Sequence, residues 1–302
     1  MASMRDIKRR KSSVESTQQI TKAMKLVSTV KLQKAKARAE QSSAYFDAIY
    51  KTVSSILARS GNINHRYLKT AESQKKAVIM ITSNKGLAGG YNANIIKLIT
   101  RNPEFTPENT VIYAVGKKGR DATERLGYKL MSDYSDVMDN PVYTDAMDIM
   151  QDVLDAFEAG EIGEIYLAYT FFKNTVSHIP TLLKLLPVTS VTERQKSEED
   201  EAVDAKPEAE EAETDDSTPM NFEPEDEEAL DMIIPKYMTS LIFGALVESV
   251  ASENGARMQA MDSATNNATE MIEHLSLLYN RARQSSITQE LTEIIAGADA
   301  IN

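Results

Sequence analysis

Glycine and proline are missing from the first sixty residues, and this absence constrains the fold more than any other feature. The first glycine is Gly61, and no proline occurs before Pro103. Both residue types interrupt helices, whereas the segment is rich in Lys, Ala, Gln and Glu, which favour them. Its apolar residues recur at helical spacing: Ile20, Met24, Val27, Phe46, Ile49, Val53 and Ile56. The sequence therefore predicts one long helix over residues 1–60.

The C-terminal end predicts a second long helix. No proline follows Pro235, and apolar residues again step by three and four along the chain. This apolar stripe contains Met271, Leu275, Leu278, Ala282, Ile287, Leu291 and Ile294. We assign residues 229–302 to this helix. It begins either near residue 236 or near residue 225 with a kink at Pro235, and it ends near residue 296.

Two helices of this length need partners. Each would be roughly 80–90 Å long at ~1.5 Å per residue, and an isolated helix cannot bury its own apolar stripe. The segment between them would form a domain only roughly 30–35 Å across. Parallel helices would require the chain to cross a whole rod length, so we expect an antiparallel coiled coil. Ala, Ser and Met stand in the stripes, which therefore differ from Leu heptads.

Residues 61–196 alternate between strand and helix patterns. Strands are expected at 76–82, 110–115 and 162–172, with a further extended piece at 176–188 that Pro180 breaks. Helices are expected near 91–101, from the Gly116–Gly119 turn to about residue 126, and at 144–159. The order predicts an α/β domain with a mostly parallel sheet. The fold class is therefore α+β or α/β, with a long antiparallel coiled coil and an α/β domain.

The net charge of −11 comes from one segment. Residues 197–231 hold seventeen Asp or Glu and one Lys, whereas residues 5–38 hold eleven Lys or Arg and two acids. The acidic stretch has too few apolar residues to offset the entropy of ordering the chain. We therefore expect residues 197–228 to form a disordered insertion.

A glycine-rich turn, Ser83–Gly90, lies where a phosphate-binding loop would lie, after a strand and before a helix. A P-loop carries Lys-Ser/Thr after its last glycine, but here Lys85 precedes the glycines and Tyr91 follows them. This order favours a structural turn over a nucleotide site. The Gly116–Gly119 turn holds two lysines, and solvated side chains are the simplest interpretation of them.

Composition argues against several kinds of chemistry. The chain has no Cys, and its three His, at 65, 178 and 274, are too far apart for a local metal motif. No Ser/His/Asp arrangement stands out, so we expect neither catalysis nor a cofactor. The start lacks an apolar signal region, and no run of about 18 apolar residues predicts a membrane span. We expect a cytoplasmic chain.

The basic N-terminal helix leaves three surfaces to weigh: DNA, a membrane, or an acidic protein surface. No base-reading module accompanies the helix, and its charges spread around it, which favours the protein surface or solvent over nucleic acid. Two classes of function remain on these grounds. One is a helical scaffold or mechanical subunit, and the other is a nucleotide-binding α/β protein with coiled-coil arms.

Four segments carry a resemblance to a known family. They are Thr17–Val27 (TQQITKAMKLV), Thr82–Asn92 (TSNKGLAGGYN), Ala251–Met258 (ASENGARM) and Tyr279–Ile294 (YNRARQSSITQELTEI). In order and across nearly the whole chain, they resemble the gamma subunits of bacterial F-type ATP synthases. Mild departures occur at Lys11, Gln19, Asn84 and Ala88. The larger departure is an acidic insertion of roughly twenty residues before the C-terminal helix.

The resemblance implies a function that residue spacing does not show. It implies a non-catalytic rotor shaft that couples proton-driven rotation of the membrane c-ring to conformational cycling of the beta subunits. It further implies a Rossmann-like domain that binds no nucleotide. The partners would be the alpha and beta subunits as a hexamer, the epsilon subunit and the c-ring. The chain would be a peripheral protein on the cytoplasmic face of the cell membrane.

The resemblance also implies a contact site for a beta-subunit loop. Arg283, Gln284, Thr288 and Glu290 would reach that loop, within a polar cluster that also contains Arg281. Antiparallel geometry would place the N-terminal helix near Met24 level with residues somewhere around 270–285. The predicted contact residues are therefore Lys22, Met24, Lys25, Arg283, Gln284, Thr288 and Glu290.

Overall fold

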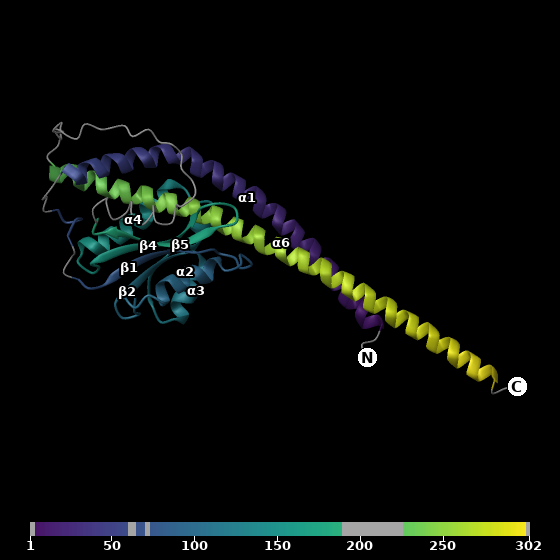
Figure 1. Ribbon diagram of the computed structural model, residues 1–302. Coiled ribbons are helices and arrows are strands. Elements are labelled where there is room, and N and C mark those ends of the chain that lie inside the picture. Colours follow the sequence, from purple (N-terminus) through teal and green to yellow (C-terminus); the bar gives the residue numbers. More distant parts are fainter. Residues whose placement is uncertain (1–3, 60–64, 70–72, 189–225, 300–302) are drawn as a thin grey trace. The chain divides into compact units, whose positions relative to one another are not determined.

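The computed structural model describes residues 4–59, 65–69, 73–188 and 226–299 (Figure 1). All but the last three residues of the predicted acidic insertion lie outside these ranges. The described chain contains two long helices, α1 (Met4–Arg59) and α6 (Asp226–Asp299). Both predicted terminal helices are therefore confirmed, and α6 continues through Pro235.

The chain divides into two compact units, and both long helices contribute to each. The first unit comprises Met1–Leu32, Leu87–Gly89 and Asn254–Asn302, and the second comprises Gln33–Gly86 and Gly90–Glu253. The inner parts of the two helices, residues 33–59 of α1 and 226–253 of α6, group with the sheet, and their outer parts belong to the first unit.

The second unit is built on a five-stranded sheet in the order β3-β2-β1-β4-β5. Its strands are β1 (Lys76–Ile81), β2 (Thr110–Val115), β3 (Lys129–Asp133), β4 (Glu164–Phe172) and β5 (His178–Leu186). Only β5 runs antiparallel to its neighbour. The expected mostly parallel sheet is confirmed, and the first four strands have the order typical of Rossmann-like folds.

Alternating side chains of the strands supply two apolar cores. From β1, Ala77, Ile79 and Ile81 enter one core, which α4 (Tyr143–Glu158) and the inner part of α6 cover. Val78 and Met80 enter the other core together with Ile95 and Ile99 of α2 (Tyr91–Thr100). The strands read as continuous apolar runs because both faces of the sheet are buried. The short helices α3 (Lys117–Arg125) and η1 (Ser135–Asp139) complete this unit.

Two expectations about the sheet are wrong. Strand β3 was not expected, because its sequence, KLMSD, is short and half polar, as suits an edge strand. Pro180 does not break β5. A proline cannot donate a hydrogen bond to the ladder, but β5 is an edge strand, where that loss is tolerated.

Charged residues close the end of the sheet where β1 and β4 begin. Glu164 accepts hydrogen bonds from Lys184 Nζ at 2.7 Å and from the Tyr166 hydroxyl at 3.0 Å, and Lys76 Nζ lies 3.5 Å away. Burial alone would raise the pKa of the Glu164 carboxyl. The hydrogen bonds and the two ammonium groups outweigh burial and hold this pKa below its ordinary value.

Part of α6, within Leu230–Gly297, is long and apolar enough to cross a membrane by length and composition alone. Just over half of that stretch, 56%, is buried inside the protein. Core residues of the second unit lie on this helix, among them Leu230, Ile234, Met238, Ile242 and Leu246, all with no exposed surface. A helix that lines a protein core meets the same two criteria, so the absence of a membrane span stays a prediction.

Candidate functional site

In the first unit, α1 and α6 meet along faces with a strict seven-residue repeat (Figure 1). On α1 the buried or half-buried positions include Met4, Ile7, Lys11, Val14, Gln18, Thr21, Lys25, Ser28 and Leu32. On α6 they include Met258, Met261, Thr265, Ala268, Ile272, Leu275, Tyr279 and Ala282. Steps alternate between three and four, which is the spacing of a coiled coil.

Three side-chain pairs show the direction and register of this contact. Gln18 Nε2 donates to Thr269 Oγ1 at 2.7 Å, and the hydroxyls of Thr21 and Thr265 lie 2.8 Å apart. Lys25 Nζ forms an ion pair with Asp262 at 2.6 Å. Residue numbers rise on α1 while they fall on α6, so the expected antiparallel arrangement is confirmed.

Two residues of the apolar stripe predicted on α1, Ile20 and Val27, do not face α6. Ile20 is 60% exposed and Val27 is 58% exposed, while the buried face carries Thr21 and Ser28. For these two residues the prediction was wrong, because it considered apolar side chains alone as the contact face. Here polar side chains such as Thr21 pair across the helix contact instead, and a second, uncovered apolar face lies on the outside.

The register also separates residues that were expected to lie level. Lys25 is level with Asp262, so Met24 faces the region near residue 263 and not residues 270–285. At ~1.5 Å per residue, Arg283 lies roughly 30 Å further along the shared axis. The expected juxtaposition of the lysines with the polar cluster is therefore wrong, because no sequence signal fixed the stagger of the helices.

The predicted contact residues form two separate sets. Lys22 is exposed, whereas Met24 is half-buried and Lys25 is engaged with Asp262. The other set is exposed on the outer part of α6: Arg283, Gln284, Thr288 and Glu290. The Thr288 hydroxyl donates to the carbonyl of Gln284 at 2.9 Å. No salt bridge within the described part of the chain occupies Arg283 or Glu290.

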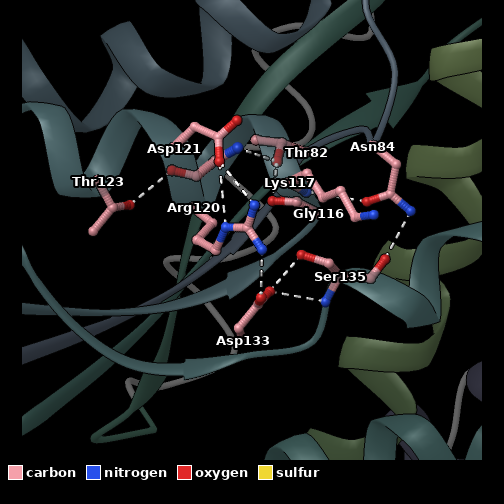
Figure 2. Close-up of polar contacts among 10 residues, drawn as sticks. Thr82, Asn84, Gly116, Lys117, Arg120, Asp121, Thr123, Asp133 and Ser135 are labelled. Atoms are coloured by element: carbon pink, nitrogen blue, oxygen red, sulfur yellow. Dashed lines mark hydrogen bonds and ion pairs between the residues drawn. The ribbon is translucent and has the colours of Figure 1, made fainter.

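In the second unit, the carboxyl end of β1 is joined tightly to the start of α3 (Figure 2). The backbone N–H of Lys117 donates to Asn84 Oδ1 at 3.0 Å, and that of Lys118 donates to the carbonyl of Ser83 at 3.1 Å. The N–H of Gly119 donates to Thr82 Oγ1 at 2.8 Å. Helix N-terminal N–H groups are the groups that bind phosphates in nucleotide-binding folds, and here the chain's own oxygens already occupy them.

Two glycines make this close approach possible. Gly116 has φ +108°, and a Cβ built there would lie 2.1 Å from the carbonyl oxygen of Thr82. A Cβ on Gly119 would lie 2.7 Å from Thr82 Oγ1. The glycines therefore serve contact between β1 and α3. This role was missed, because a Gly-Lys-Lys-Gly turn gives no sign of what it touches.

Neighbouring side chains stabilise this contact between the carboxyl end of β1 and α3. Asn84 Nδ2 donates to the carbonyl of Ser135 at 2.8 Å, and Arg120 forms an ion pair with Asp133 at 3.0 Å (Figure 2). Burial alone would raise the pKa of the Asp133 carboxyl. Hydrogen bonds from Ser135 and the Arg120 guanidinium outweigh burial and lower this pKa. The described residues contain no group of His, Asp or Glu that could hold a metal ion.

Known proteins resemble this chain over its full length. A family model described as ATP synthase matches residues 3–301. The ATP synthase gamma chain of Lachnoclostridium phytofermentans is 63% identical over 302 residues, which cover 100% of both chains. The sodium ion specific ATP synthase gamma chain of Acetobacterium woodii is 40% identical and covers 99% of each.

Solved structures share the fold. A chain of the Euglena gracilis mitochondrial ATP synthase, in an assembly with OSCP, F1 and c-ring, has a TM-score of 0.65 at 21% identity. That match covers 99% of this chain and 94% of the other. A chain of the central stalk and c-ring of the Tetrahymena thermophila enzyme has a TM-score of 0.55 at 24% identity, and it covers 81% of this chain and 99% of the other.

The antiparallel pair of long helices and the Rossmann-like domain share the fold of these ATP synthase chains. The family match and the relatives make the assignment specific. The chain belongs to the ATP synthase family, among its gamma chains.

Proposed function

We propose that this chain is the central rotor shaft of an F-type ATP synthase. It couples proton-driven rotation of a membrane c-ring to conformational cycling of catalytic beta subunits, and in reverse it couples ATP hydrolysis to proton pumping. The chain itself is non-catalytic and carries no cofactor. Membership in the gamma-chain family supports this proposal, because the relatives that share its full length bear that name.

One observation carries the proposal beyond the name. The helices of the first unit expose large apolar side chains along their outer faces: Ile20, Leu26, Val27, Val30, Leu277, Ile287, Leu291, Ile294 and Ile295, each at least 49% exposed. A protein that stands alone in water rarely keeps so many such side chains uncovered in one region. A sleeve of other subunits would cover them. We assign that sleeve to the hexamer of alpha and beta subunits.

The outer part of α6 offers the polar contacts that torque transfer needs. By the observed register, Arg283 is level with Met4, so residues beyond it extend past the end of α1. Arg283, Gln284, Thr288 and Glu290 would bind a beta-subunit loop there. Lys22, Met24 and Lys25 would form a second contact, roughly 30 Å away along the axis.

The remaining partners follow from the same role. The epsilon subunit and the c-ring would bind the end of the rotor opposite the α6 tip, and no nucleic acid takes part. The chain would be a peripheral protein on the cytoplasmic face of the cell membrane. The name of the Acetobacterium woodii relative specifies sodium ions. The proton as the transported ion is therefore proposed separately from the rotor function and is tested separately.

Purification of a tagged chain from native membranes tests the assignment. We expect an ATPase hexamer and a c-ring to co-purify, and the isolated chain to hydrolyse no ATP. ATP hydrolysis by the pure chain that Lys85→Ala abolished would contradict it. In membrane vesicles, a proton ionophore should abolish ATP synthesis while a sodium ionophore should not. The reverse result would replace the proton by sodium.

A further inference from the structure

The contact between α1 and α6 is polar at three neighbouring levels. We use the term polar seam for the pairs Gln18–Thr269, Thr21–Thr265 and Lys25–Asp262, whose polar atoms lie 2.6–2.8 Å apart. Thr21 is only 8% exposed. The hydroxyls of Thr21 and Thr265 also bond to the carbonyls of Gln18 and Met261 in their own helices, at 3.0 and 2.7 Å. The contact between the helices therefore adds a directional preference for one alignment.

The coiled-coil positions on either side of the seam would tolerate sliding. Most of them are apolar, such as Leu32, Met258 and Ile272, and their contacts have no direction, although Lys11 and Ser28 are polar. Apolar packing of this kind stabilises a helix pair without selecting one stagger. The buried inner part of α6, with Leu230 and Leu246 in the core of the second unit, opposes sliding of the whole helix, and directional pairs are needed to select the stagger of the outer part.

Only the observed register satisfies the whole seam. If α6 moved by one heptad in one direction, Thr21 would face Met258 and Lys25 would face Gly255. In the other direction Thr21 would face Ile272, and Lys25 would face Thr269 in place of Asp262. Each slip breaks the contact between the two threonine hydroxyls, which then keep only their bonds to carbonyls of their own helices, and separates the ion pair.

We propose that the polar seam fixes the axial register of α1 against α6, and that Gln18, Thr21 and Lys25 are positioning residues for the outer part of α6. The side chains of Lys25 and Asp262 are 40% and 48% exposed, so their ion pair adds little to stability. Its contribution is to select one stagger. The consequence for coupling rests on the proposed function, whereas the register itself does not.

Spin-label distances in the full chain test the register directly. The chain has no Cys, so Gln19→Cys and Asn280→Cys introduce the only two labelling sites, both at exposed positions. The labels lie about twelve residues apart in level, or roughly 18 Å along the axis, and a heptad slip changes this offset by roughly 10 Å. We expect one narrow distance distribution in this parent protein.

A variant whose seam residues are all apolar should no longer show one narrow spin-label distance. The variant carries Gln18→Leu, Thr21→Val, Lys25→Leu, Asp262→Leu, Thr265→Val and Thr269→Leu. It should remain at least as stable as the parent, because apolar residues replace both partners of each pair. Its distance distribution should broaden or gain a population shifted by about 10 Å. A single unchanged distance would overturn the proposal.

Smaller changes guard against misfolding of that variant. Lys25→Asp places a carboxylate beside Asp262 and should shift the distance, whereas Lys25→Asp with Asp262→Lys should restore it. A matched control away from the seam, Thr17→Val with Asn266→Leu, should leave the distance unchanged. If the reversed pair did not restore the parent distance, or if the control variant shifted it, the seam would not be what fixes the register.

Coupling in the assembled complex tests the consequence. The apolar-seam variant should pump at least two-fold fewer protons per ATP hydrolysed than the parent, at equal amounts of complex. Normal coupling despite a shifted register would overturn the positioning role. If the chain assembled with no ATPase, the proposed function would fail, while the label distances would still decide the register.

Discussion

Helix α6 belongs to two environments that are built on opposite principles. Its inner part, near Ile242 and Leu246, has no exposed surface and packs in the core of the sheet unit. Its outer part pairs with α1 through polar and small residues and leaves apolar side chains such as Ile294 uncovered. The difference teaches that hydrophobicity alone does not locate the contact faces of this helix. Apolar burial holds the inner part, whereas polar pairing selects the register of the outer part.

The largest effect is expected when the same Leu→Ala substitution is made in each of the two environments of α6 and the free energies of unfolding are compared. Leu246→Ala removes a fully buried side chain and should lower the free energy of unfolding by about 2–5 kcal/mol. Leu277→Ala removes a side chain that is 61% exposed and should cost less than about 0.5 kcal/mol. Chemical denaturation of the isolated chain measures both. Equal costs would mean that the outer part is buried in the free chain.

The contact between the carboxyl end of β1 and the start of α3 should be almost as sensitive to substitution. In Gly116→Ala the new methyl group would collide with the Thr82 carbonyl, and φ +108° would be strained, so we expect a loss of about 3 kcal/mol. Gly127→Ala is the control, because Gly127 also has positive φ but nothing lies within 4 Å of its Cβ position. It should cost about 1 kcal/mol. Similar values for the two variants in thermal unfolding would refute the clash.

Exposed polar residues on the outer part of α6 should affect coupling and not folding. Contacts to charged groups are worth about 1.5–3 kcal/mol each, so Arg283→Ala with Gln284→Ala should reduce ATP synthesis several-fold while the complex stays assembled. Gln289→Ala with Glu293→Ala is a comparable change on the same helix, at a pair that bonds only to itself. ATP synthesis and proton pumping in vesicles, normalised to assembled complex, decide the matter. A site at Arg283 is excluded if both double variants behave alike.

The smallest expected effect lies in the sheet unit and depends on pH. Because its folded-state pKa is lowered, Glu164 contributes stability above its ordinary pKa of about 4.3, and this is lost as pH falls through the folded value. Glu164→Gln should therefore cost about 1 kcal/mol at pH 7, and the difference from the parent should shrink below about pH 4. Glu104→Gln, at a carboxylate whose side chain is 61% exposed beside the same Lys76, is the matched control and should cost less than about 0.5 kcal/mol at pH 7. Urea denaturation across pH provides the comparison.

Most of the sheet unit could be predicted from sequence because burial on both faces makes its strands apolar throughout. Strands β1 and β2 are examples, and β3 escaped because an edge strand needs no such pattern. The helix pair was predicted in kind and direction. Its inner face was not, because Gln18, Thr21 and Lys25 resemble surface residues until their partners are known. Their seven-residue spacing was the available signal.

The predicted beta-subunit site shows where a sequence stops informing. Arg283 and Lys22 belong to resembling motifs, but only coordinates separate them along the axis. The stagger of two helices depends on pairs more than two hundred residues apart, such as Thr21 and Thr265. No local pattern encodes such a distance. Whether either set touches a beta subunit stays a prediction.

The seven-residue repeat shared by α1 and α6 has a mechanical consequence. A repeat of 3.5 residues per turn winds two helices around each other with a left-handed sense. Twist applied in that sense tightens the winding and presses the side chains of the contact together, whereas twist in the opposite sense draws them apart. The torsional response of such a helix pair depends on the sense of the applied twist. We therefore expect its stiffness to differ between clockwise and anticlockwise loading, so that the amino-acid spacing itself gives the rotor a preferred direction of strain.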